Sequence, residues 1–176
     1  IRHPTGVYVA RHGRGYSRFE HARYGIALEL LQFAAPDAPI KISRLMVRNL
    51  SGRTRHLTVT AYVEWVLGTS SAVTAPSIST EIDAATGALL ARNLSSGPDA
   101  RVAFVDLRGR QAAWTGDRRE FIGRNGTLGR PAALVGRTAL SGRTGAGLDP
   151  CGALQAPLVL AADSSVEIVW LLGEAA

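Results

Sequence analysis

Residues 56–65 alternate strictly between apolar and polar side chains. The apolar positions are Leu57, Val59, Ala61, Val63 and Trp65, and the polar positions are His56, Thr58, Thr60, Tyr62 and Glu64. Successive side chains of a β-strand point to opposite faces, so this pattern predicts a long strand with one buried and one solvated face. The Thr, Val, Tyr and Trp content also suits a pleated surface. Such a strand needs a second apolar layer to cover its buried face.

Other apolar runs of strand length recur along the chain, separated by turn residues. They lie at 26–33, 40–49, 78–83, 89–93, 102–107, 111–115, 154–160 and 166–172. A spacing of roughly 8–12 residues, with little helical periodicity, is typical of antiparallel sandwiches and barrels. The sequence therefore predicts an all-β fold, specifically an antiparallel β-sandwich.

The run that precedes residues 56–65 is interpreted as its hairpin partner. Residues 40–67 predict an antiparallel hairpin that turns at 50–53, where Ser and Gly favour a turn. The alternation slips between Ile42 and Leu45, which predicts a β-bulge at that point.

Three further segments carry specific expectations. Residues 84–87 predict a short hairpin loop in which Gly87 tolerates a positive φ. Residues 166–172 are apolar on both faces, which predicts a strand covered on both sides. The glycine-rich stretch 123–150 shows no pattern, so it predicts a long irregular loop.

The 176 residues suit one domain spanning residues 1–176 with a core of its own. The first residue is Ile1 rather than methionine, which suggests a fragment of a larger multidomain enzyme. No signal-peptide pattern precedes the first strand, and no apolar run approaches the roughly 18 residues of a membrane span. We therefore expect no membrane contact by this segment.

Charge and cysteine content narrow the function. The net charge is +6, but Lys41 is the only lysine and the arginines are scattered along the chain, which argues against nucleic-acid binding. The single cysteine, Cys151, cannot form an intrachain disulfide, which fits a reducing compartment. Its Asp-Pro-Cys-Gly context indicates a turn and a structural role.

Residues 11–21 concentrate His, Arg, Glu, Tyr and Phe around two glycines that predict a tight, exposed turn. Two readings stay open. The segment presents polar and aromatic groups to a sugar or a neighbouring domain, or it is an Arg–Glu-pinned loop with Tyr16 and Phe19 in the core. His12 and His21 match no zinc signature and lack further ligands, so no metal is expected.

Asp117 and Glu120 are the only acids that lie close together near aromatic residues, as a glycosidase carboxylate pair would. Arg118 and Arg119 stand between them and are expected to hold both carboxylates ionised, which suits salt bridges better than a general acid. No nucleophile, dinucleotide loop or cofactor motif accompanies them. The sequence thus predicts neither catalytic residues nor a cofactor in this chain.

Five segments together resemble a known family. They are RHGRGYSRFEH at 11–21, GI and EL within 25–30, KISRL and RNLSGR within 41–53, YVEWVLG at 62–68 and GDRREFIGRNG at 116–126. In this order and spacing they resemble the N-terminal supersandwich domain of glycoside hydrolase family 94. The similarity is greatest to the phosphorylase-like region of cyclic β-1,2-glucan synthases.

The resemblance implies a galactose mutarotase-like supersandwich that is present here in incomplete form. It further implies that a separate (α/α)6 barrel carries the catalytic aspartate, and that this non-catalytic domain packs on the barrel, takes part in a homodimer and contacts β-glucan. The parent would be a bacterial glycosyltransferase or glycoside phosphorylase anchored in the inner membrane, with this region cytoplasmic. The alternative is an autonomous carbohydrate-binding module for glucans.

Sugar sites combine aromatic platforms with charged or amide hydrogen-bonding groups. By that criterion the candidates for carbohydrate or interdomain contact are Tyr16, Arg18, Glu20, Trp114, Asp117, Arg118 and Glu120.

Overall fold

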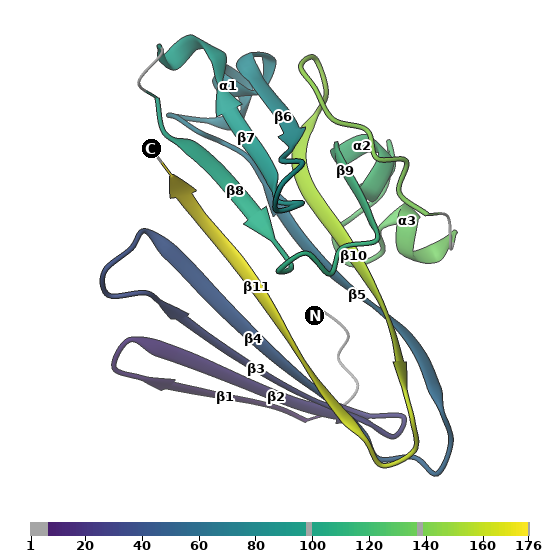
Figure 1. Cartoon of the computed structure of the whole chain (residues 1–176). Helices are drawn as coiled ribbons and strands as arrows, with labels where there is room; N and C mark the ends of the chain where they lie inside the picture. Colours follow the sequence, from purple (N-terminus) through teal and green to yellow (C-terminus); the bar gives the residue numbers. More distant parts are fainter. Residues whose placement is uncertain (1–6, 98–99, 137–138, 176) are drawn as a thin grey trace.

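The computed structural model describes residues 7–97, 100–136 and 139–175, and its strands form two antiparallel sheets packed face to face (Figure 1). In spatial order the eight-stranded sheet contains β1 (Tyr8–Gly13), β2 (Tyr16–Arg23), β3 (Ile26–Ala34), β4 (Ile40–Asn49), β11 (Ser165–Ala175), β8 (Val102–Asp106), β7 (Leu89–Asn93) and β6 (Ile78–Ile82). The three-stranded sheet contains β5 (Arg55–Glu64), β10 (Pro150–Leu160) and β9 (Ala113–Asp117). The predicted all-β sandwich is confirmed.

Helical structure is confined to the connections between strands. The helices are α1 (Ser71–Thr74), α2 (Arg118–Ile122), α3 (Ala132–Val135) and two 3₁₀ turns at Ala75–Ser77 and Leu94–Ser96. None of the helices in the described ranges is long and apolar enough to cross a lipid bilayer. The segment 123–150 is largely irregular, as predicted, although it contains α3.

The predicted hairpin over 40–67 is wrong, because its two strands lie in different sheets. β4 pairs with β3 and β11, whereas β5 pairs with β10. The turn between them carries the chain across the core, so the apolar faces of β4 and β5 meet across the layers instead of lying side by side. An alternating strand followed by a turn has the same sequence pattern in both arrangements, which is why the pattern could not separate them.

The predicted bulge in β4 is also wrong. The register of β4 with β3 runs without a shift from Lys41 to Asn49. Leu45 faces the core, and Ile42 and Met46 lie on the opposite face of the sheet. The slip in the alternation therefore reflects apolar side chains on the outer face.

Two hairpins complete the larger sheet. β6 pairs with β7 as predicted, and Gly87 in their loop has φ +76°. The hairpin of β1 and β2 was not predicted as strands, although its turn at Arg14 and Gly15 falls in the expected segment and Gly15 has φ +77°. A hairpin with charged side chains on one face lacks the clean apolar alternation that identified the other strands.

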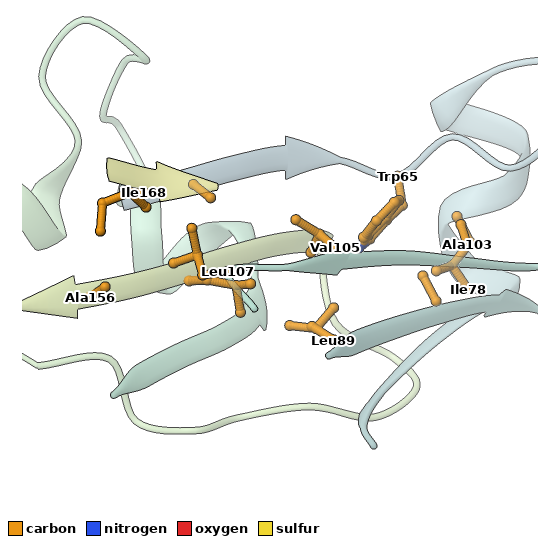
Figure 2. Close-up of a cluster of buried hydrophobic side chains, with 11 residues drawn as sticks. Trp65, Ile78, Leu89, Ala103, Val105, Leu107, Ala156 and Ile168 are labelled. Carbon is orange, nitrogen blue, oxygen red and sulfur yellow. The ribbon is translucent and has the colours of Figure 1, made fainter. Parts of the chain in front are cut away.

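The main core lies between the inner faces of the two sheets (Figure 2). Its buried members are Ala61, Trp65, Ile78, Leu89, Ala91, Ala103, Val105, Leu107, Leu154, Ala156 and Ile168. A second cluster lies on the other face of the small sheet, where α2 and α3 cover it. Its buried members are Phe121, Ile122, Ala133, Leu140, Cys151 and Ala153. Part of the small sheet is thus covered on both faces.

Asn49, at the end of β4, ties together two of the connections that cross between the sheets. Its side chain is buried, and its Nδ2 donates to the carbonyl of Arg53 at 2.8 Å and to that of Ala161 at 2.8 Å. Its Oδ1 accepts from the amide of Ser51 at 3.0 Å and from the Ser51 hydroxyl at 2.6 Å. One amide therefore fixes both the β4–β5 and the β10–β11 crossings.

We expect Asn49→Asp to lower the free energy of unfolding by about 3 kcal/mol, because a buried carboxylate cannot donate to the carbonyls that the amide satisfies. The measurement is urea denaturation at neutral pH. Asn125→Asp, at an exposed position, serves as the control. Equal stability of both variants would contradict the role assigned to Asn49.

Candidate functional site

Tyr16, Arg18 and Glu20 alternate along β2 and therefore lie on the same, outer face of the larger sheet. Arg18 bridges Glu20 at 2.8 Å and Glu29 of β3 at 2.7 Å, and Glu20 also pairs with Arg11 of β1. The hydrogen bond from Arg11 is the main reason that the pKa of Glu20 lies below its usual value. This carboxylate is thus ionised at neutral pH and serves to link adjacent strands.

The ring of Tyr16 packs across the hairpin onto Gly13, where a β-carbon would overlap with it. Tyr16 stays 46% exposed and borders a shallow hollow of about 450 Å³ at the end of β2. The hollow is also lined by His12, Gln32 and Lys41. An aromatic face beside amide and charged groups is the combination that sugar sites use.

Trp114 lies on β9, far along the sandwich from β2, and it is not a free platform. Its carbonyl accepts from the amide of Gly142 at 2.9 Å, and its indole ring lies against that glycine. The indole Nε1 is buried and has no hydrogen-bond partner among the described residues. The loop that contains Gly142 therefore covers part of the ring.

Asp117 is the N-cap of α2 and is 5% exposed. Its Oδ1 accepts from the amide of Arg119 at 3.0 Å, and its Oδ2 pairs with Arg143 at 3.2 Å. The cap satisfies a helix-end N–H that has no intrahelical partner. The aspartate thus starts α2 and attaches the 123–150 segment to it.

Glu120 binds the same segment at a second point. Its carboxylate accepts from the Thr115 hydroxyl at 2.6 Å, the Ser141 amide at 2.6 Å and the Ser141 hydroxyl at 2.9 Å. Asp117 and Glu120 thus each hold a separate contact to the 123–150 segment.

Arg118, one of the two arginines expected to pair with these acids, has other partners. Arg118 pairs with Glu64 of β5 at 3.1 Å and with Asp149 at 3.5 Å, and the partner of Asp117 is Arg143. The expectation failed because α2 begins at Arg118 and directs this side chain toward β5. Sequence proximity between charges does not decide which of them meet after folding.

Sequence reasoning missed the network around Tyr62 and Glu64 on the outer face of β5. The Tyr62 hydroxyl donates to Glu64 at 2.7 Å, and the Tyr62 ring stacks on Phe121 with centroids 4.7 Å apart. Burial raises the pKa of Tyr62, and the hydrogen bond from Tyr62 is the main cause that lowers the pKa of Glu64. The available signal was that the two residues share the polar face of one strand.

Cys151 lies in β10 and not in the predicted turn. It is fully buried, and its Sγ contacts the carbonyl of Thr115 at 3.8 Å. Burial raises the pKa of the thiol, with carboxylates nearby adding to the effect. The group that could act as a nucleophile, the thiolate, is thus disfavoured at neutral pH.

The seven predicted residues form two separate groups, one on β2 and one on β9 and α2, at opposite ends of the layers (Figure 1). Within the described ranges, no three His, Cys, Asp or Glu side chains lie close enough to hold a metal ion together. His12 contacts the Ser17 hydroxyl at 2.9 Å, and His21 stacks on Tyr8 with centroids 4.0 Å apart. Both imidazoles therefore take part in the β1–β2 hairpin.

Comparisons with known proteins agree with this two-layer sandwich. The family model described as the glycosyl hydrolase 94 supersandwich domain matches residues 1–176. The cyclic beta-(1,2)-glucan synthase NdvB of Rhizobium meliloti (strain 1021) is 35% identical over 175 residues, which are 99% of this chain and 6% of that protein. A solved polysaccharide lyase superposes on 89% of this chain and 21% of its own with a TM-score of 0.52 at 10% identity, which shows a shared fold alone.

The two antiparallel sheets packed face to face place the chain among the β-sandwich domains. The chain belongs to the glycosyl hydrolase 94 family as a supersandwich domain. It spans only a small fraction of the length of the glucan synthase that it matches.

We expect Glu120→Ala to release the loop around Ser141 and to lower the free energy of unfolding by about 1–3 kcal/mol, because the Ser141 donors and the hydroxyl of buried Thr115 lose their acceptor. Hydrogen exchange followed by mass spectrometry should show faster exchange at residues 139–146. The control, Glu81→Ala, removes a surface carboxylate 3.6 Å from Arg92 and should cost under about 0.5 kcal/mol. Unchanged hydrogen exchange in Glu120→Ala would show that Glu120 does not hold the loop around Ser141.

The lowered pKa of Glu64 predicts a pH-dependent contribution to stability. Because the folded pKa lies below the unfolded value of 4.5, the contribution is complete above that pH and is lost as pH falls through the folded pKa. At pH 7, Glu64→Gln should cost less than about 1 kcal/mol, since the side chain is 44% exposed and solvent screens it. Thermal denaturation of variant and wild type should converge in acid.

Tyr62→Phe provides the matched control, since it removes the hydroxyl but keeps the ring that stacks on Phe121. In that background the effect of Glu64→Gln should be smaller and less dependent on pH. An effect of the same size in both backgrounds would show that the hydroxyl is not the cause.

Proposed function

We propose that this chain is a non-catalytic supersandwich domain of a longer cyclic β-1,2-glucan synthase or related phosphorylase. In this proposal it packs on the catalytic barrel of the same polypeptide. The observation that carries the proposal is the use of the candidate acids. Asp117 caps a helix and pairs with Arg143, and Glu120 holds Ser141, so neither carboxylate is free to act on a substrate. The identity with NdvB over 99% of the chain supports the parent class.

The proposed setting is the cytoplasmic side of a bacterial inner membrane. The support is chemical: the one cysteine is buried and in no disulfide, which fits a reducing compartment.

Carbohydrate contact is a second proposed role, and Tyr16 is the residue that favours it. Its exposed ring, beside Gln32 and Lys41, offers an aromatic surface with hydrogen-bonding groups around it. Trp114 does not support this role, because its loop covers it. In the parent enzyme this end of β2 would face the glucan.

Glucan synthesis by the full-length polypeptide tests the non-catalytic role. We expect Asp117→Asn and Glu120→Gln to change the rate by less than about tenfold, because loss of a general acid or base costs roughly 10²–10⁴-fold. Thermal denaturation of the same samples separates loss of folded protein from loss of chemistry. A drop of more than a hundredfold at unchanged stability would make the residue catalytic.

Isothermal titration of the 176-residue chain with linear and cyclic β-1,2-glucans tests the second role. A purely structural domain gives no heat up to millimolar sugar. Heat that disappears in Tyr16→Ala and persists in Tyr24→Ala, an exposed tyrosine outside the hollow, would establish carbohydrate contact at β2.

A further inference from the structure

The two layers of the sandwich are unequal. The small sheet faces the β11, β8, β7 and β6 part of the larger sheet, whereas β1 to β4 extend beyond the β5 edge of the small sheet (Figure 1). A hollow of about 510 Å³ lies between the inner face of this overhang and β5. Its walls include Phe19, Leu28, Leu30 and Leu45 from the larger sheet and Leu57 from β5.

β5 is an edge strand whose open side borders this hollow. In the described chain it pairs with β10 alone, and every residue from Leu57 to Ala61 lines the hollow. In an antiparallel pair only alternate residues bond to a given neighbour, so the others direct N–H and C=O groups to the open side.

The middle of this edge lacks charge, proline and a bulge, three of the features that protect exposed edges. Residues 57–63 include no charge and no proline, and the register with β10 runs unbroken from Arg55 to Glu64. Natural edge strands are usually shortened, bulged, charged or covered. An edge strand with an uncharged middle and an unbroken register is therefore expected to have a partner in the working protein.

A buried polar atom beside the hollow also lacks a partner. Trp170 of β11 is one of the residues that line the hollow, and its buried indole N–H has no hydrogen-bond partner among the described residues. Leaving a buried donor unsatisfied costs roughly 1–3 kcal/mol, so such groups normally have partners. A strand laid along β5 would bring backbone carbonyls into this space.

We propose that an extended segment of the parent polypeptide, outside residues 1–176, adds to β5 as a fourth strand of the small sheet and fills the hollow. The inference rests on the proposed function in one respect, namely that a longer polypeptide carries this chain. The relative NdvB leaves ample chain for this purpose, since this domain matches 6% of it. The added strand would present alternate apolar side chains to Phe19, Leu30 and Leu45.

The geometry disfavours two other occupants. A glucan needs hydrogen-bonding partners for its hydroxyls, and the walls of the hollow are mainly aliphatic and aromatic. A second copy would pair β5 with β5 about a two-fold axis normal to the sheet, which keeps both larger sheets on the same side. The β1–β4 overhangs of the two copies would then occupy the same space.

Hydrogen exchange at residues 55–64 tests the proposal, comparing the 176-residue chain with the full-length polypeptide. Strand addition should slow exchange at the β5 amides by about tenfold or more in the full-length protein. In that protein Leu30→Glu, on the inner face of β3, should abolish the slowing. Leu31→Glu, the next residue on the opposite face, should preserve it.

Equal exchange in the two proteins would overturn the proposal. If exchange in the 176-residue chain slows as protein concentration rises, the occupant is a second copy. If exchange slows on addition of β-1,2-glucan, the occupant is a sugar. Either result also overturns the proposal. Activity assays keep the two proposals distinct. Protection of β5 without glucan synthesis would refute the proposed function alone, and synthesis without protection would refute the added strand alone.

Discussion

The connections between the two sheets are the constraint on which the rest of the structure depends. β4 passes to β5, β5 to β6, β8 to β9 and β10 to β11 by crossing from one layer to the other. At two of these crossings the buried amide of Asn49 satisfies backbone groups that the turns would otherwise leave unpaired. An amide can do this because it both donates and accepts, which no apolar residue of similar size could replace. The apolar faces of both sheets then meet at fixed positions.

The need to satisfy backbone hydrogen-bonding groups also determines what the side chains of the candidate site do. Asp117 and Glu120 accept hydrogen bonds from a helix end and a loop that lack other acceptors, so their charges stabilise local backbone. Arg18 pairs with Glu20 on its own strand and with Glu29 on the neighbouring strand. Carboxylates whose oxygens accept hydrogen bonds in this way hold neighbouring segments of the sandwich together. Tyr16 differs because its ring remains open to solvent.

Several elements were predictable because local side-chain patterns reflect burial directly. The strands β3, β5, β6, β7 and β11 and the loop at Gly87 followed from alternation and turn residues. The hairpin of β1 and β2 escaped notice because its outer face holds ion pairs that blur the alternation. The bulge expected at Ile42 was wrong because outer apolar residues such as Met46 are half-buried beside charged chains.

What the sequence determined by itself was the kind of layer: alternating strands, few helices and a family resemblance carried by long motifs. Only the tertiary structure decided which strands pair. The connection at 50–54 joins strands of two different sheets, and its sequence pattern is the same as that of a hairpin turn. It also decided the partners of the charges, with Arg118 turning to Glu64 and Arg143 to Asp117. The physical reason is that burial depends on each residue's own chemistry, whereas pairing depends on neighbours distant in sequence.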